Sequence, residues 1–137
     1  DFPVKTAKQP RKKEKRTVLI LINKNKVALR QRPGTGLLAA LWEFPNFQGE
    51  LSEHEMTSLL SEMGISVESL EKSKKAKHIF THIEWHMSGY LAIAENPVEC
   101  FEFQWIDINF LKEELALPAA FNPYLQTLDP FIDPRII

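Results

Sequence analysis

The sequence predicts a single α+β domain with a mixed, mostly antiparallel sheet flanked by helices. Three observations predict it: a β-branched and leucine run at 17–22, a helix signature at 52–64, and an alternating strand pattern at 101–106. A chain of 137 residues is long enough to bury the core of one domain. Strand patterns outnumber helical ones, so we expect the element order β-β-β-α-β-β-β-α-α.

The first sixteen residues differ in charge from the rest of the chain. They hold seven Lys or Arg against Asp1 and Glu14, and they lack apolar periodicity. Such a run is typical of a solvated linker, so we predict a linker or basic arm at 1–16 and a domain at 17–137. The remainder holds ten basic and sixteen acidic groups, so any contact with nucleic acid must be local. A linker at the start also suggests that another segment precedes it.

The first half of the domain has clear strand and turn signals. Residues 17–22 have the pattern of a strand buried on both faces, and 27–31 form a hairpin partner across the turn at 23–26. Residues 32–36 contain Pro and Gly and break the sheet. Residues 37–45 begin as an apolar turn and end extended, because Pro45 disfavours helical geometry at Phe44.

Helix signals are strongest after residue 51. Ser52 and Glu55 form a capping box, and Gly64 supplies a left-handed stop, which predicts a helix at 53–63. An edge strand is expected at 65–73, a strand at 74–87 that continues through 89–94, and another at 101–106. Asp107 caps a helix that ends near residue 115. A final short helix begins at residue 118 and carries on one side Phe121, Tyr124 and Leu128.

The stretch 74–87 places an aromatic residue among polar ones. Read with a period of two, its apolar face holds Ile79, Ile83, Trp85 and Met87, and its polar face holds His78, His82, Glu84 and His86. Phe80 falls on the polar face, after Lys74, Lys75 and Lys77. A surface that stacks on bases and touches phosphates needs such residues. The alternative is that the strand turns at Phe80 and the ring is ordinary core. Both interpretations stay open at this point.

The sequence offers little support for a metal or cofactor. Alternate strand residues lie about 7 Å apart, which is long for three of these side chains to reach one zinc ion unless the strand bends. Cys100 is the only cysteine, so no disulfide, four-cysteine zinc site or iron–sulfur cluster can form within the chain. We expect an inert thiol, no cofactor and a cytoplasmic protein. The longest apolar runs are too short to span a membrane.

The order of strand, loop, helix ending in Gly64 and Ile65, and further strands resembles the Nudix hydrolases. Their loop–helix motif reads G-x5-E-x7-R-E-U-x-E-E-x-G-U, where U is a bulky aliphatic residue. Aligned on Gly64, the motif keeps only one glutamate, because its five other defining positions fall on Glu43, Gly49, Thr57, Ser58 and Ser61, and its last glutamate falls on Glu62. A magnesium ion that bridges a diphosphate needs several converging carboxylates, so we expect neither a metal site nor pyrophosphatase activity.

Two motifs resemble the C-terminal domain of the adenine-DNA glycosylase family MutY. They are RPGTGLLAALWEFP at 32–45 and KHIFTHIEW at 77–85, and the similarity covers nearly the whole chain. The resemblance implies that an absent N-terminal domain excises adenine and carries an iron–sulfur cluster. The C-terminal domain lies on the other DNA strand and recognises the 8-oxoguanine paired with that adenine. Residues 1–16 then resemble the connector between the two domains.

The resemblance also assigns roles to residues in a loop that interrupts the strand. It implies that Phe80 wedges into the base stack, the Thr81 hydroxyl addresses the oxidised base, and His82 holds a phosphate. Lys77 and His78 are further expected DNA contacts, and Lys74 and Lys75 are either backbone contacts or a solvated run. Many relatives have serine where this chain has Thr81, which keeps the hydroxyl but restricts its rotamer. No catalytic residue is expected.

The sequence therefore favours a non-catalytic domain that reads 8-oxoguanine opposite adenine. The expected partners are duplex DNA with this mispair and the protein's own N-terminal catalytic domain, in the cytoplasm of a bacterium at the nucleoid. The alternatives are a free-standing Nudix-like hydrolase of oxidised nucleotides and, with less support, a protein-interaction domain without a ligand.

Overall fold

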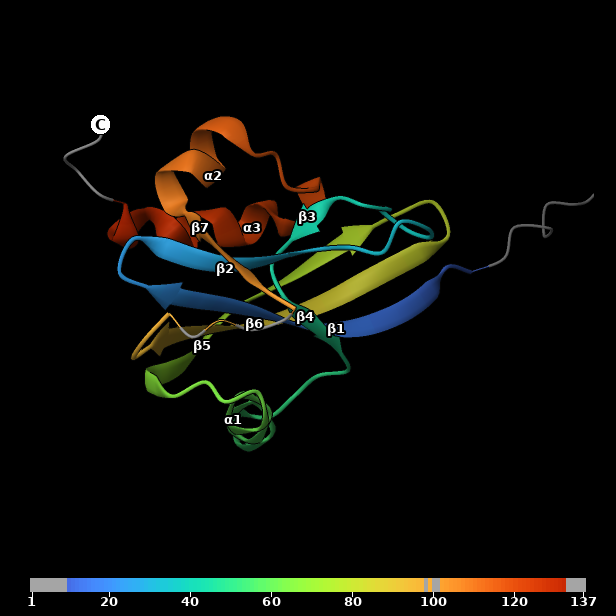
Figure 1. Ribbon diagram of the computed structural model, residues 1–137. Coiled ribbons are helices and arrows are strands. Elements are labelled where there is room, and N and C mark those ends of the chain that lie inside the picture. The colour runs from blue at the N-terminus through green and yellow to red at the C-terminus, as the bar shows by residue number, and fades with distance from the viewer. Residues whose placement is uncertain (1–9, 98, 100–101, 133–137) are drawn as a thin grey trace, which may run out of the picture.

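The computed structural model describes residues 10–97, 99 and 102–132. In chain order its elements are β1 (Lys12–Asn23), β2 (Lys26–Gln31), β3 (Trp42–Glu43), β4 (Asn46–Gln48), α1 (Glu53–Glu62), β5 (Val67–Ile79), β6 (Ile83–Ala94), β7 (Gln104–Asp107), α2 (Ile108–Glu114), the 3₁₀ helix η2 (Ala119–Phe121), α3 (Asn122–Leu125) and the 3₁₀ helix η3 (Gln126–Phe131). The strands form one sheet, which lies between α1 on one face and the C-terminal helices on the other (Figure 1). The predicted fold class is confirmed.

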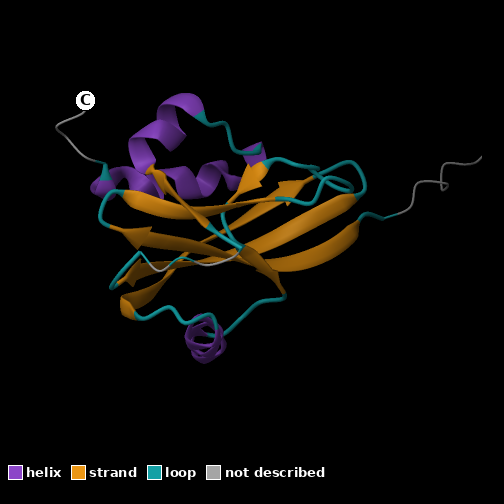
Figure 2. Ribbon diagram, viewed as in Figure 1, coloured by secondary structure: helices purple, strands orange, loops and turns teal. Residues whose placement is uncertain are grey.

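The sheet has the order β3-β2-β1-β6-β5, with β4 also paired to β1 and β7 to β2. The central pair, β1 with β6, is parallel, and the other strand pairs are antiparallel. Figure 2 shows the strands as a continuous middle layer with helices only outside it. The prediction of a mixed, mostly antiparallel sheet is therefore correct, and β5 lies at the edge as expected.

Strand β1 forms the centre of the fold because both of its faces are buried. Val18, Ile20 and Ile22 pack toward the C-terminal helices, and Leu19 and Leu21 pack toward α1. The predicted hairpin with β2 is confirmed, since Ile22 pairs with Val27. Lys24 adopts a left-handed φ of 55° in the two-residue turn.

The predicted boundary of the linker at residue 16 is wrong. Strand β1 begins at Lys12, and its parallel pairing with β6 starts at Ile83. Pairing with a neighbouring strand satisfies the backbone groups of 12–16, which overrides the tendency of a charged run to remain solvated. Residues 1–9 of the expected arm lie outside the described part of the chain.

Helix α1 has the predicted caps. The Ser52 hydroxyl accepts a hydrogen bond from the Glu55 amide at 3.1 Å, and the Glu55 carboxylate accepts one from the Ser52 amide at 2.8 Å. Gly64 follows the helix with a φ of 76°, as the stop signal requires. Met56 and Leu60 bury the inner face of the helix against the sheet.

The strands at 65–94 differ from the prediction. Instead of an edge strand at 65–73 and a separate strand at 74–87, the structure has β5 and β6, joined by a turn at 80–82. The turn reverses the chain, so His78 pairs with Trp85 while Glu84 and His86 project from the other face. The predicted histidine-rich face is therefore wrong for His78.

The C-terminal segment covers the sheet face opposite α1. Asp107 caps α2 by accepting a hydrogen bond from the Asn109 amide at 2.9 Å, as predicted. The final helix is a succession of 3₁₀ and α turns, and its three expected core residues, Phe121, Tyr124 and Leu128, are fully buried. Strand β7 begins at Gln104, and Cys100 and Phe101 lie outside the described residues.

Candidate nucleic-acid interface

The turn at 80–82 lies where β5 and β6 meet, next to the first residue of β1. The Phe80 amide donates to the Ile83 carbonyl at 2.7 Å, and the Lys12 amide donates to the His82 carbonyl at 3.1 Å. These two backbone contacts hold a short turn that three strands share. The loop expected to interrupt the strand is thus present, and it contains Phe80, Thr81 and His82.

Phe80 is half-buried and belongs to a row of aromatic rings. Its ring meets that of Trp85 edge to face at 5.0 Å and that of His78 at 4.7 Å. Trp85 is fully buried, so one side of Phe80 contacts the core while the rest of the ring remains accessible. The Phe80 ring therefore packs against the core on one side and is partly exposed on the other, and its contact with a base stays a prediction.

Thr81 and His82 are exposed at the tip of the turn. Their side chains have no hydrogen-bond partner within the described ranges, so the Thr81 hydroxyl and the His82 imidazole can bind another molecule. The His78 ring contacts the Phe80 ring, and His78 projects from the sheet face that the C-terminal helices cover. The structure brings Phe80, Thr81 and His82 together at the tip and places His78 beside them.

Lys77 belongs to a charge cluster that the sequence did not reveal. The cluster surrounds the Glu84 carboxylate, whose side chain is 9% exposed, with three basic groups: His86 at 2.8 Å, Arg11 at 3.5 Å and Lys77 at 4.0 Å. The hydrogen bond from His86 is the largest of the effects that lower the pKa of Glu84, with Lys77 and Arg11 adding to it. Lys77 is therefore partly neutralised, although its ammonium group remains exposed.

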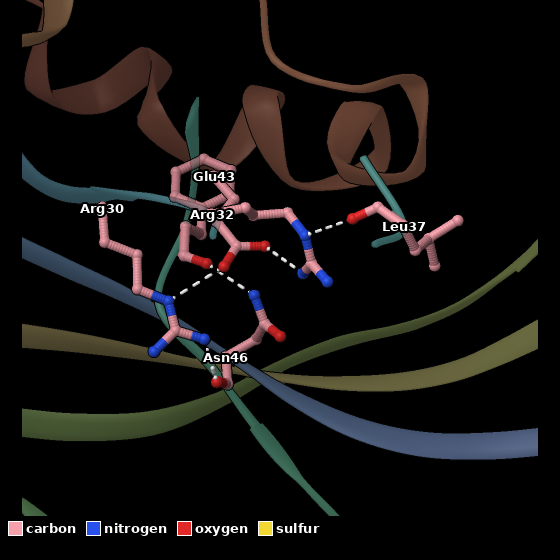
Figure 3. A network of polar contacts seen from close by, with 6 residues as sticks. Arg30, Arg32, Leu37, Glu43 and Asn46 are labelled. Carbon is pink, nitrogen blue, oxygen red and sulfur yellow. Dashed lines mark hydrogen bonds and ion pairs between the residues drawn. The ribbon is translucent and has the colours of Figure 1, made fainter. Parts of the chain in front are cut away.

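A second buried carboxylate, that of Glu43, lies on β3, at the edge of the sheet opposite β5. Glu43 is 1% exposed and accepts charge-assisted hydrogen bonds from Arg30 at 2.9 Å and Arg32 at 2.8 Å. Figure 3 shows the Glu43 carboxylate between the two guanidinium groups. Arg30 also donates to the Asn46 carbonyl, and Arg32 to the Leu37 carbonyl, which fixes the loop at 32–45 against the sheet.

The arginine cluster is connected to the turn through Trp85. The guanidinium carbons of Arg16 and Arg32 lie 5.1 and 5.5 Å from the centre of the Trp85 ring, which also contacts Phe80. Burial lowers the pKa of Arg16. Arg16, Arg30 and Arg32 line a cleft of about 520 Å³. Sequence reasoning missed this network, for which the spacing of Arg30 and Arg32 across the end of β2 was the available signal.

The carboxylates of α1 do not fit a metal that bridges a diphosphate. Glu55 is held by the capping box, and Glu62 lies two turns further on, about 10 Å along the helix axis. Thr57, Ser58 and Ser61 occupy the surface between them. Within the described ranges, no group of three or more His, Cys, Asp or Glu side chains could hold a metal ion.

Among the helices that the structure describes, none is long and apolar enough to cross a membrane.

Comparison with protein families matches residues 17–127 to the family described as NUDIX domain. Adenine DNA glycosylase from Mus musculus is 34% identical over 109 residues, which cover 71% of this chain and 21% of that protein. The Homo sapiens protein of the same name is 30% identical over 110 residues, which cover 72% and 20%. The chain thus spans about one fifth of the length of these relatives.

Solved structures share the fold. The C-terminal domain of mouse MUTYH, in a complex with human PCNA, superposes with a TM-score of 0.65 at 23% identity, over 85% of this chain and 87% of that one. MutT, from a study of the Aliivibrio salmonicida and Vibrio cholerae proteins, gives a TM-score of 0.61 at 20% identity, over 85% and 97%. These comparisons confirm the resemblance that the motifs at 32–45 and 77–85 predicted.

Proposed function

Since this chain belongs to the NUDIX domain family and keeps one glutamate of the family's loop–helix motif, we propose that it is a non-catalytic domain that recognises 8-oxoguanine opposite adenine in duplex DNA. The observation that carries this proposal is the turn at 80–82. It presents an anchored aromatic ring beside a hydroxyl and an imidazole that have no hydrogen-bond partner among the described residues. The similarity to adenine DNA glycosylases supports DNA as the ligand.

Each residue of the turn matches one part of a damaged duplex. Phe80 has a partly exposed ring that can stack against a base step, and the buried Trp85 ring packs against it edge to face from the core. 8-Oxoguanine differs from guanine by a hydrogen on N7 and an oxygen on C8, and the Thr81 hydroxyl can accept from the first or donate to the second. His82 lies at the tip and Lys77 on the adjoining end of β5, where a backbone phosphate would follow the base.

Removal of the adenine is assigned to another part of the same protein. The relatives are about five times longer than the matched region, which leaves room for a catalytic domain. That domain would bind the adenine strand and carry the iron–sulfur cluster, while this domain contacts the opposite strand. The protein would then act at the bacterial nucleoid, in the cytoplasm.

Hydrolysis of free oxidised nucleotides is the alternative function, and the structural likeness to MutT keeps it testable. The alternative needs metal-binding carboxylates, of which α1 supplies Glu62 at the family position. Incubation of this chain with magnesium and 8-oxo-dGTP should release no pyrophosphate. Appreciable release would contradict the non-catalytic proposal.

The role of Thr81 can be tested by DNA binding. The wild-type chain and Thr81→Ala are compared on two duplexes, one with 8-oxoguanine and one with guanine opposite adenine. Loss of one hydrogen bond, worth about 0.5–1.5 kcal/mol, should reduce the preference for the oxidised base by about 2- to 13-fold. Thr81→Ser should retain the preference because it keeps the hydroxyl. Thr57→Ala, an exposed position on α1, is the matched control. Equal preference in wild type and Thr81→Ala would remove Thr81 from the site.

A further inference from the structure

A basic surface separate from the tip of the turn at 80–82 lies on the α1 face of the sheet, and we infer that it binds the phosphodiester backbone of DNA. It consists of Lys13 and Lys15 from β1, Lys75 and Lys77 from β5, and His86 from β6, and we name it the lysine face. This inference rests on the proposed function. It extends that function by assigning DNA contacts to the beginning of β1, which its charged composition alone would predict to be part of a linker.

The strand register brings these side chains to one face. Lys15 of β1 and Lys77 of β5 both pair with His86 of β6, so the three residues form one row across neighbouring strands. Lys75 pairs with Ser88 in the next row. Residues paired in register project to the same side of a sheet, and strands lie about 4.8 Å apart, so Lys15 and Lys77 flank His86 at the bases of their side chains.

The row is accessible because α1 does not extend over it. Helix α1 packs on Leu19, Leu21 and Tyr90, which belong to the later part of β1 and to β6. Figure 1 shows the beginning of β1 and the turn between β5 and β6 extending beyond the helix. Consistent with this, the side chains of Lys15 and Lys75 are 69% and 76% exposed.

The lysine face carries an excess of positive charge in a chain whose net charge is −1. Its acidic neighbours are Glu50, which lies 3.8 Å from Lys15 and 3.3 Å from Lys75, and Glu84, which is paired with Lys77. Together with Arg11, the four lysines outnumber these two carboxylates by three charges. Ion pairs between exposed groups are weak, so a polyanion can replace Glu50 as the partner of two lysines.

The shape of the surface also fits a nucleic-acid backbone. Lys15, Lys75 and Lys77 border an open groove of about 420 Å³ whose floor includes His86 and Ser88. Along the strands, the lysine face extends from Lys13 to the level of Lys75, a distance of four residues or roughly 13 Å. Across the sheet it covers the three strands β1, β6 and β5, or roughly 10 Å. This area is too large for one phosphate ion and suits several successive phosphates of a DNA strand that passes the turn at 80–82.

The salt dependence of DNA binding tests this inference. Binding of the 137-residue chain to an undamaged fluorescent duplex is measured between 50 and 200 mM NaCl for wild type and for the double variant Lys15→Gln, Lys75→Gln. Each phosphate contact contributes about 0.9 to the slope of log K against log salt, so the double variant should lose about 1.8 from the slope. Over this fourfold range of salt, the factor by which the affinity falls should then be about 12 times smaller for the double variant than for the wild type.

The control is the double variant Lys24→Gln, Lys26→Gln, which removes the same charge at the opposite end of β1. It should keep the wild-type slope, and all variants should unfold at similar temperatures. A wild-type slope in Lys15→Gln, Lys75→Gln, an equal loss in the control, or no measurable duplex binding would overturn the inference. Displacement of the duplex by inorganic phosphate at matched ionic strength would also overturn it in favour of a small-anion site.

The outcome is separable from that of the proposed function. The duplex used here has no lesion, and the turn at 80–82 is intact in both double variants. A normal preference for 8-oxoguanine with an unchanged salt slope would refute only the lysine face. An altered slope without any lesion preference would refute only the reading of 8-oxoguanine.

Discussion

Among the five glycines, Gly89 on β6 is the one where an added methyl group would meet the packing of the sheet against the C-terminal helices. A Cβ at this position would lie 2.7 Å from Cε1 of Tyr124, 3.2 Å from Cβ of Ser73 and 3.3 Å from the Lys74 carbonyl oxygen. The Tyr124 ring is fully buried, and its hydroxyl donates to the Lys74 carbonyl at 3.1 Å, so it cannot move freely. The same contact links α3 to β5 at the residue before Lys75.

The expected cost of Gly89→Ala follows from these distances. Ordinary contacts begin near 3.4 Å, so the ring or the strand must shift by about 0.7 Å, and overpacking of a core typically costs about 1–3 kcal/mol. The lower entropy of the unfolded alanine variant returns about 0.4–1 kcal/mol. We expect a net loss of about 1–2 kcal/mol, which lowers the melting temperature by several degrees.

The assay is thermal and urea unfolding of wild type, Gly89→Ala and Gly34→Ala. Gly34 has no atom within 4 Å of an added Cβ and no left-handed φ, so its alanine variant should be as stable as wild type or slightly more stable. Combining Gly89→Ala with Tyr124→Leu should cost less than the sum of the single changes, because the shorter side chain removes the contacting ring atom. Full stability of Gly89→Ala, or strict additivity with Tyr124→Leu, would refute this packing argument.

Three further predictions concern the groups around the turn. Phe80→Ala should weaken binding to a duplex with 8-oxoguanine by at least about 5-fold, because base–aromatic stacking is worth about 1–3 kcal/mol; an unchanged dissociation constant in a binding titration would argue against the wedge. Glu43→Gln should destabilise the fold by about 3 kcal/mol in urea unfolding, because it leaves Arg30 and Arg32 without their buried carboxylate partner. Glu50→Gln, which removes an exposed ion pair, should cost little stability. Similar losses of stability in the two variants would contradict the role of the Glu43 network. The pKa of Glu84 is lowered in the folded chain, so its ion pairs stabilise the protein fully above the carboxyl's ordinary pKa of 4.5, and this stabilisation is lost as the pH falls below that value. The variant Glu84→Gln should therefore show a weaker loss of stability in acid. Identical profiles of stability against pH for the variant and wild type would exclude the cluster as the source of the acid dependence.

Local signals predicted local elements well. The capping box of Ser52 and Glu55 and the stop at Gly64 determine α1 because they satisfy the helix's own backbone groups. The apolar run in β1 predicted burial on both faces, since no polar residue interrupts residues 18–22. These elements depend on neighbours within a few residues, which is why the sequence pattern contains them.

The reversal between β5 and β6 could not be read from periodicity. Alternation of apolar residues continues through 79–87, but the turn at 80–82 exchanges the faces, so Ile79 pairs with Glu84 while Trp85 is buried on the other side. A period of two gives the spacing of side chains along a strand and contains no information about where the chain reverses. The resemblance to a family, rather than the pattern, located this turn.

The charge clusters were missed because their members are far apart in the sequence. Arg11 and Glu84 are 73 residues apart, and their contact requires the parallel pairing of β1 with β6. The same pairing made residues 12–16 a strand although their composition is that of a linker. Arg30 and Glu43 are closer, at 13 residues, but their contact depends on the path of the loop between β2 and β3.

The most direct test of lesion recognition is the ratio of two dissociation constants of the wild-type chain at low salt. The two duplexes are identical except that one has 8-oxoguanine and the other guanine opposite adenine, so they differ only in the groups at N7 and C8. A turn that reads these groups through Thr81 predicts tighter binding to the oxidised duplex, by about 2-fold or more. Equal dissociation constants would contradict the proposal that this domain recognises 8-oxoguanine.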